Sequence, residues 1–180
     1  MTAMRRTVVT GIVGFALGSL LTSTLVKGQA PINKLEGKFG HVAIVVKDVD
    51  KSAKVFADIF GVPVPATRIV KNIPFPPSYG PGKTMGTKTT MLQANGMSLE
   101  LIEPLEGPSP WRDHLEKYGE SVHHIAFAVP EWMPAIKYLE SKGGKWVQGV
   151  EQYNFGYVDM MPQLGFTIEV MGPKINLPPQ

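Results

Sequence analysis

The feature that most constrains the fold of this 180-residue chain is an internal repeat. Residues 40–46 read Gly-His-Val-Ala-Ile-Val-Val, and residues 123–129 read His-His-Ile-Ala-Phe-Ala-Val. Each segment is an apolar run typical of a buried strand, and each carries a histidine near its start, His41 in the first and His124 in the second. A repeat of this kind predicts two copies of one supersecondary unit.

A helix-like stretch follows each of these strands. Residues 50–60 place apolar side chains at helical spacing and end at Gly61. Residues 131–142 show the same spacing and end at Gly143 and Gly144. Because glycine just past the last periodic residue is the usual C-terminal stop of a helix, both copies predict a strand followed by a helix.

Each copy also closes with an apolar strand that carries a single acid. Residues 98–102 contain Glu100, and residues 166–170 contain Glu169. We therefore expect two strand–helix–strands units joined by a connector. The expected boundaries are 36–104 for module one, 105–119 for the connector and 120–172 for module two, within a domain spanning 36–172.

Alternation along a strand decides which face each side chain occupies. His41 and His124 share their faces with small residues, while larger apolar residues point the other way, toward the side suited to packing beneath a helix. By the same alternation, Glu100 and Glu169 lie on the face away from the helix. Two such units curling together bring two imidazoles and two carboxylates into one pocket.

Two buried carboxylates need a counter-charge, because burying each ion alone costs several kcal/mol. A lone strand histidine is more often a structural or surface residue, and a lone glutamate can simply face water. The matched recurrence of both residue types in both copies favours a single divalent metal ion instead. Mixed nitrogen and oxygen ligation suits Zn, Ni, Co, Mn or Fe better than Ca or Mg. The predicted ligands are His41, Glu100, His124 and Glu169.

The connector and the second strand contain two further histidines. Ser109 stands where an N-cap is expected, with Pro110 at the first helical position, so a short helix is predicted there. His114 follows within that helix, has no matching partner in the repeat and is expected to face solvent. His123 falls on the opposite face of its strand from His124 and is expected on the exterior.

A proline- and glycine-rich run over residues 73–86 predicts a long loop inserted in module one. Long loops in compact domains are often binding elements. Tyr79, Lys83 and Lys88, in or near this run, are therefore candidates for contact with a substrate, although solvation is the commoner fate of such residues.

The charge distribution speaks against a nucleic-acid partner. The net charge of +3 comes from residues 1–30, which hold Arg5, Arg6 and Lys27 and no acid, so that 15 basic and 15 acidic residues remain. No basic stripe is left to follow a phosphate backbone. The chain has no cysteine, which excludes disulfides, a thiol nucleophile and thiolate metal ligands.

Residues 1–30 are typical of a targeting segment. Arg5 and Arg6 precede the uncharged stretch 7–26, and a small-x-small pattern favours cleavage after Ala30. An uncleaved membrane anchor over 7–26 is the alternative, although small and polar residues interrupt this stretch. The segment around the two arginines also resembles a twin-arginine export signal. We expect an exported protein, periplasmic or secreted.

The mature region resembles the vicinal-oxygen-chelate (glyoxalase/bleomycin resistance/dioxygenase) superfamily over residues 38–172. Its most specific parts, residues 98–105, 109–110 and 122–127, are most similar to the branch of the methylmalonyl-CoA epimerases and glyoxalase I. The resemblance implies an α+β fold in which two paired βαβββ modules form an open, U-shaped eight-stranded sheet around a metal site. It also implies that the metal ligands are His41, Glu100, His124 and Glu169.

The resemblance also implies a class of chemistry. In such enzymes the metal stabilises an enolate, and Glu169 or Glu100 removes and returns a proton. The expectation is a metal-dependent isomerase, epimerase or lyase acting on a small hydroxy-carbonyl-type substrate. Residues 72–80 lack the acid that epimerases carry there, and Val45 replaces an arginine of glyoxalase I. Neither named activity is therefore assigned.

Two other function classes remain open at this point. Ring-cleaving, iron-dependent dioxygenases use two histidines and one glutamate, and the additional acid at Glu100 speaks against them. Non-catalytic small-molecule-binding relatives generally lack the metal ligands. A homodimer is also possible, because modules of this kind can pair between chains as well as within one.

Overall fold

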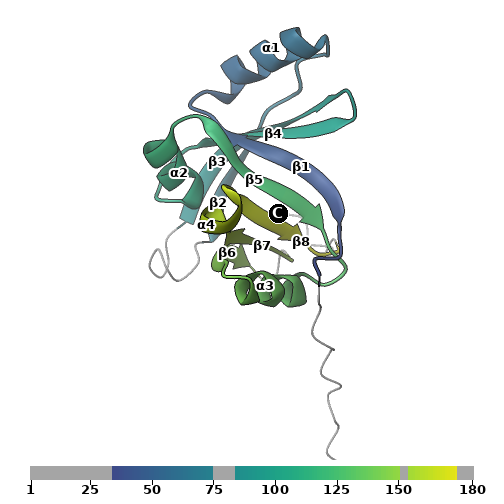
Figure 1. The fold of residues 1–180 in the computed structure, drawn as a ribbon. Coiled ribbons are helices and arrows are strands. Elements are labelled where there is room, and N and C mark those ends of the chain that lie inside the picture. The colour runs from purple at the N-terminus through teal and green to yellow at the C-terminus, as the bar shows by residue number, and fades with distance from the viewer. Residues whose placement is uncertain (1–33, 75–83, 151–153, 174–180) are drawn as a thin grey trace, which may run out of the picture. The chain divides into compact units, whose positions relative to one another are not determined.

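The computed structural model describes residues 34–74, 84–150 and 154–173 (Figure 1). These residues belong to one unit, 31–180. The expected leader lies outside the described residues. In the described part of the chain, no helix combines the length and the apolar character needed to cross a membrane.

The elements form two βαβββ units joined by a helix, and the second unit also contains a short helix before its last strand. The first unit consists of β1 (Lys38–Val45), α1 (Val49–Phe60), β2 (Arg68–Pro74), β3 (Thr84–Ala94) and β4 (Met97–Pro104). The connecting helix is α2 (Pro110–Tyr118). The second unit consists of β5 (Ser121–Ala128), α3 (Trp132–Ser141), β6 (Lys145–Val150), β7 (Phe155–Asp159), α4 (Met161–Leu164) and β8 (Thr167–Met171). The predicted strand–helix–strands repeat is confirmed.

The strands form one mixed eight-stranded sheet in the order β2-β3-β4-β1-β5-β8-β7-β6. The antiparallel pair β1–β5 joins the two units, and the parallel pairs β1–β4 and β5–β8 flank it. Gln148 of β6, at one edge, lies 3.9 Å from Met85 of β3, next to the other edge (Nε2 to Sδ). The sheet therefore curls on itself, and the open, U-shaped α+β fold is confirmed.

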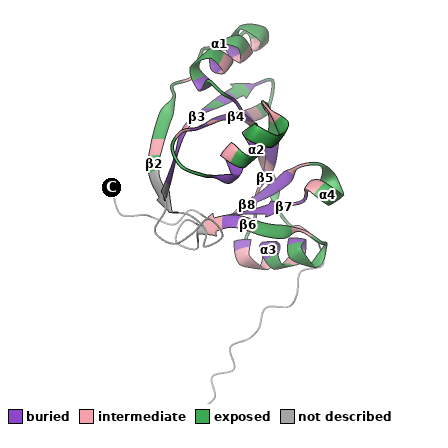
Figure 2. Ribbon diagram, turned by 90° about the vertical axis from the view of Figure 1, so that its left-hand side faces the viewer, coloured by how far each residue is buried: buried purple, intermediate pink, exposed green. Residues whose placement is uncertain are grey.

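Helices α1 and α3 cover the outer face of the sheet, one on each unit (Figure 1). Helix α1 packs on Leu99 and Leu101 of β4, and α3 packs on Ile168 and Val170 of β8. Figure 2 shows buried residues along β5, β7 and β8 and exposed residues on the outer side of α1. Because side chains alternate along a strand, the residues between these apolar positions face the concave side.

The helix ends follow the local signals in the sequence. The Asp48 side chain accepts a hydrogen bond from the Lys51 backbone N–H at 2.9 Å, which caps the start of α1. Gly61 ends that helix with a left-handed backbone (φ 66°), a conformation that favours glycine. Ser109 caps α2 by accepting from the Arg112 backbone N–H at 3.0 Å. The predicted start of the connecting helix is confirmed.

A separate apolar cluster fills the concave side between the two units. Trp111 projects from α2 and meets Tyr157 of β7 edge to face, with ring centroids 5.9 Å apart. Ala43 and Val45 of β1 and Ile102 of β4 pack in the same cluster. Helix α2 therefore packs on the concave face, on the opposite side of the sheet from α1 and α3.

The predicted loop over residues 73–86 is too long at both ends, because β2 and β3 extend into it. Cross-strand pairing of these two strands overrides the turn signal of the prolines and glycines. Lys88 lies on β3 and pairs with Asp50 at the start of α1, so it belongs to the helix-covered side of the sheet. Tyr79 and Lys83 lie outside the described residues.

Replacing Leu101 with alanine tests the core beneath α1. Leu101 is completely buried, so truncation leaves a cavity and is expected to lower the free energy of unfolding by about 2–5 kcal/mol. Urea denaturation followed by circular dichroism measures the loss. Leu164→Ala is the matched control, because Leu164 is half exposed and its truncation should cost less than about 0.5 kcal/mol. Equal losses in both variants would contradict this packing.

Candidate metal centre

The four predicted ligands occupy the four central strands of the sheet in one continuous row. Glu100 lies on β4, His41 on β1, His124 on β5 and Glu169 on β8, and these strands are successive neighbours. The carboxylates therefore flank the two imidazoles. His41, His124 and Glu169 are buried, with 8%, 0% and 6% of their surface exposed, whereas Glu100 is partly exposed. The expected convergence of the four side chains is what the structure shows.

The functional atoms of this row face one another at short range. The Nε2 atom of His41 lies 3.2 Å from Nε2 of His124. It lies 3.1 Å from Oε2 of Glu100 and 3.3 Å from Oε2 of Glu169. The Nε2 atom of His124 lies 3.3 Å from Oε2 of Glu169 and 3.8 Å from Oε2 of Glu100. Ligands bonded at 2.0–2.2 Å to one tetrahedral ion lie about 3.3–3.6 Å from each other. The separations here, from 3.1 to 3.8 Å, lie close to that range, as expected for side chains that can share one cation.

The carboxylate of Glu169 is a second feature suited to binding a cation. Its Oε2 atom is buried and makes no hydrogen bond within the described residues, although both imidazoles stand 3.3 Å away. An unsatisfied buried carboxylate oxygen is costly. The ligand atoms of His41, Glu100 and His124 lie within 4.8 Å of one another and can hold a metal ion, with the orphaned oxygen of Glu169 beside them.

The four side chains of the row are strongly coupled electrostatically. Burial alone would lower the pKa of His41, but Glu100 and Glu169 together raise this pKa to about 9. Burial alone would raise the pKa of Glu169, but His124 and His41 hold this pKa well below its ordinary range. The carboxylate is therefore ionised throughout the physiological range, as a metal ligand must be.

A β-bulge in β1 helps to place His41. The pairing of β1 with β5 shifts register around Gly40 and His41. A Cβ atom on Gly40 would come within 2.8 Å of the Met171 side chain and 3.1 Å of the Ala126 carbonyl oxygen. Glycine at this position therefore allows the close approach of β5 that brings the two histidine strands together.

A second register shift explains why the prediction for His123 is wrong. Ala43 pairs with His124 and Ile44 pairs with Val122, which leaves His123 as an extra residue in β5. An extra residue interrupts the alternation of faces. His123 is consequently 3% exposed and lies inside the protein, with its Nδ1 atom 2.9 Å from Nδ1 of His124. Burial, followed by the neighbouring histidines, lowers the pKa of His123 well below its ordinary value.

The expectation that His114 faces solvent is also wrong. His114 is 8% exposed, and its Nε2 atom lies 2.9 Å from the Ser121 hydroxyl, an interaction that ties α2 to the start of β5. Its ring also contacts those of Tyr118 and His123, with centroids 4.9 and 5.0 Å away. Helix α2 is amphipathic, and its inward face carries this histidine together with Trp111.

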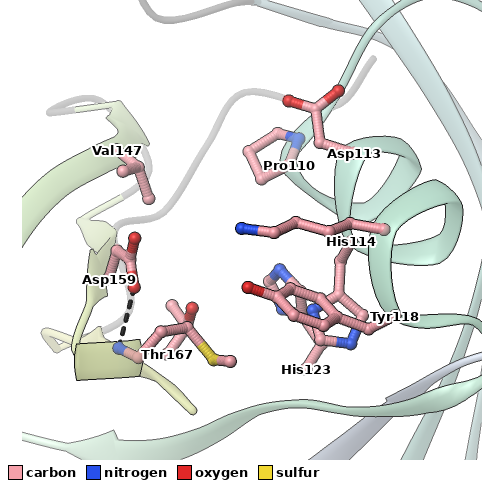
Figure 3. Close-up of a pocket in the computed structure, with 10 residues that line it drawn as sticks. Pro110, Asp113, His114, Tyr118, His123, Val147, Asp159 and Thr167 are labelled. Carbon is pink, nitrogen blue, oxygen red and sulfur yellow. Dashed lines mark hydrogen bonds between the residues drawn. The ribbon is translucent and has the colours of Figure 1, made fainter. Parts of the chain in front are cut away.

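A cavity of about 200 Å³ lies beside these inner histidines (Figure 3). His114, Tyr118 and His123 form one wall, and Asp159 and Thr167 of the paired strands β7 and β8 face them from the other side. Sequence reasoning did not predict this cavity, because it depends on how α2 packs against the second unit.

The family is shown by comparison with known proteins. Residues 40–158 match the model of the Glyoxalase/Bleomycin resistance protein/Dioxygenase superfamily. The chain belongs to this superfamily. The predicted resemblance is thereby confirmed, and the methylmalonyl-CoA epimerases are among its named relatives.

The individual relatives share a low sequence identity with this chain. The mitochondrial methylmalonyl-CoA epimerase of Mus musculus is 26% identical over 115 residues, which cover 63% of this chain and 57% of that protein. The chain thus spans somewhat more than half the length of this curated relative. The structure of the hypothetical protein BH1468 from Bacillus halodurans C-125 matches with a TM-score of 0.54 at 20% identity, over 80% of this chain and 99% of that one. Methylmalonyl-CoA epimerase from Mycobacterium tuberculosis matches with a TM-score of 0.50 at 19% identity, over 78% and 90%. These two likenesses show the fold.

The raised pKa of His41 can be measured directly in the metal-free protein. An NMR titration of its imidazole should give a midpoint near pH 9 instead of 6.5. Because the folded pKa is raised, protonation of His41 stabilises the fold below about pH 6.5, and this contribution is lost as the pH rises through about 9. Glu100→Gln should lower the midpoint, since it removes one of the two attracting carboxylates. A wild-type midpoint at or below 6.5 would contradict the described coupling.

Proposed function

We propose that this protein is an exported, metal-dependent isomerase, epimerase or lyase acting on a small hydroxy-carbonyl-type substrate. The observation that carries the proposal is the row of two imidazoles flanked by two carboxylates on adjacent strands. The proposed export rests on the leader-like composition of residues 1–30 alone.

In this proposal His41 and His124 bind one divalent ion of the Zn, Ni, Co, Mn or Fe class through their Nε2 atoms. Glu100 and Glu169 complete the ligand set through carboxylate oxygens. When bound, such an ion supplies a Lewis acid that stabilises negative charge developing on a substrate oxygen. The short separations of the two imidazole Nε2 atoms from each other and from the carboxylate oxygens support this assignment.

The two carboxylates are also the groups placed to move a proton. Glu100 and Glu169 come from strands on opposite sides of the histidine pair, so a substrate bound at the centre has a carboxylate on either side. One carboxylate removes a proton from the carbon next to a carbonyl group and can return it to the same or the adjacent carbon. Inversion of the configuration requires that the other carboxylate first takes up a proton from solvent and then delivers it to the opposite face. Glu100 is the more accessible of the two, with 18% of its side chain exposed against 8% for Glu169.

The relatives named methylmalonyl-CoA epimerase support a reaction of this class, because the stereogenic carbon of methylmalonyl-CoA lies beside a carbonyl group. Only the class of the reaction is proposed. Residues 72–80 carry no acid, and their side chains lie outside the described part of the chain. The concave apolar cluster containing Trp111 and Tyr157 is suited to excluding water from such a reaction.

Proton exchange in heavy water tests this function. The full-length protein, loaded in turn with each candidate metal, is incubated with a panel of hydroxy-carbonyl compounds, and deuterium uptake beside the carbonyl is followed by NMR. Glu100→Gln and Glu169→Gln should slow the exchange by about 10²–10⁴-fold, because each removes a group that carries the proton. Glu116→Gln is the matched control, since Glu116 is exposed on α2 and should leave the rate unchanged.

Two results would overturn the proposed reaction. Tight binding of compounds from the panel without metal and without exchange would indicate a non-catalytic small-molecule-binding protein. Consumption of oxygen by the iron-loaded protein with catechols, again without exchange, would indicate a ring-cleaving dioxygenase.

A further inference from the structure

The two ring nitrogens of His124 have different partners. Its Nε2 atom faces His41 and Glu169 at 3.2 and 3.3 Å. Its Nδ1 atom faces the other way and lies 2.9 Å from Nδ1 of His123. Both histidines are buried, with 0% and 3% of their surface exposed, so this contact is sheltered from water.

The proton positions in this contact follow from the role of Nε2. A neutral imidazole that gives its Nε2 lone pair to a cation carries its proton on Nδ1. The Nδ1–H of His124 must then donate, and Nδ1 of His123 must accept. His123 is left with its own proton on Nε2. The two adjacent histidines thus have complementary tautomers.

We propose that His123 is a positioning residue for the metal centre. By accepting the Nδ1–H of His124, it fixes the tautomer of His124 and directs Nε2 of His124 toward His41 and the carboxylates. This role rests on the proposed metal-binding function. Hydrogen-bond partners behind metal-binding histidines commonly act in this way, and their removal typically costs 10–100-fold in metal affinity.

The surroundings of His123 hold its ring in place for this task. The bulge in β5 turns His123 to the same side as His124 instead of the opposite face. The ring of His114 meets it edge to face, with centroids 5.0 Å apart, and that of Tyr157 lies 6.1 Å away. His114 is itself tied to Ser121. The packing of α2 on the second unit therefore determines the position of His123.

Zinc affinity measured by competition with a chromophoric chelator tests the role. His123→Leu removes the acceptor and should weaken zinc binding by about 10–100-fold. His123→Asn places an amide oxygen close to the position of the imidazole Nδ1 atom and should restore most of the affinity. Lys117→Met is the matched control, because Lys117 lines the same cavity from an exposed position on α2, and it should leave the affinity close to that of the wild type. Thermal unfolding of each metal-free variant monitors the fold.

A spectroscopic measurement on the wild type separates positioning from a general structural role. Long-range ¹H–¹⁵N correlation spectra of the zinc-loaded protein should show His124 protonated at Nδ1 and His123 protonated at Nε2. A proton on Nδ1 of His123 would overturn the proposal, as would a folded His123→Leu variant with unchanged zinc affinity. If His123→Leu does not fold, the zinc affinity of His123→Asn and the wild-type spectra decide whether His123 positions the imidazole of His124. A wild type that binds no zinc, nickel, cobalt, manganese or iron would instead overturn the metal-binding function itself.

Discussion

The antiparallel pairing of β1 with β5 is the interaction on which the rest of the structure depends. It joins the first strands of the two units and brings together two imidazoles that are 83 residues apart in the sequence. Each of these strands also pairs in parallel with the last strand of its own unit. The same pairing therefore sets the positions of the carboxylates. A change in the β1–β5 register would separate the four side chains and would also expose the apolar face on which the helices pack.

This pairing places two histidines and two glutamates in the middle of a largely apolar interior. Helices α1 and α3 cover one face of the sheet, and the Trp111 cluster fills much of the other. Between them, Glu169 holds an ionised carboxylate whose Oε2 atom makes no hydrogen bond within the described residues, and His41 takes up a proton more readily than an ordinary histidine. One divalent cation would satisfy the carboxylate and replace the proton. Metal binding is accordingly expected to compete with protons and to stabilise the folded state.

Much of this arrangement can be predicted from the sequence, for physical reasons that are local. Alternation assigned His41 and Glu169 to the concave face, because both lie in strands whose opposite side chains are plainly apolar. Gly61 and Ser109 marked helix ends through their own backbone and side-chain chemistry. The positions of His123 and His114 could not be predicted in this way. The first depends on a bulge defined by pairing with a distant strand, and the second depends on the docking of α2.

His123 and His114 connect the four predicted metal ligands with their surroundings. His124 links the ligand row to His123, and His123 links it to the α2 cavity, so the centre spans both units and the connector. All four side chains are proposed to bind one ion. The most direct measurement is a crystal structure of the metal-loaded protein with anomalous diffraction at the metal edge. One anomalous peak bonded to Nε2 of both histidines and to an oxygen of both glutamates, at about 2.0–2.2 Å, is the predicted result. A metal bound elsewhere, or a peak that leaves Glu100 or Glu169 without a bond to it, would contradict the claim.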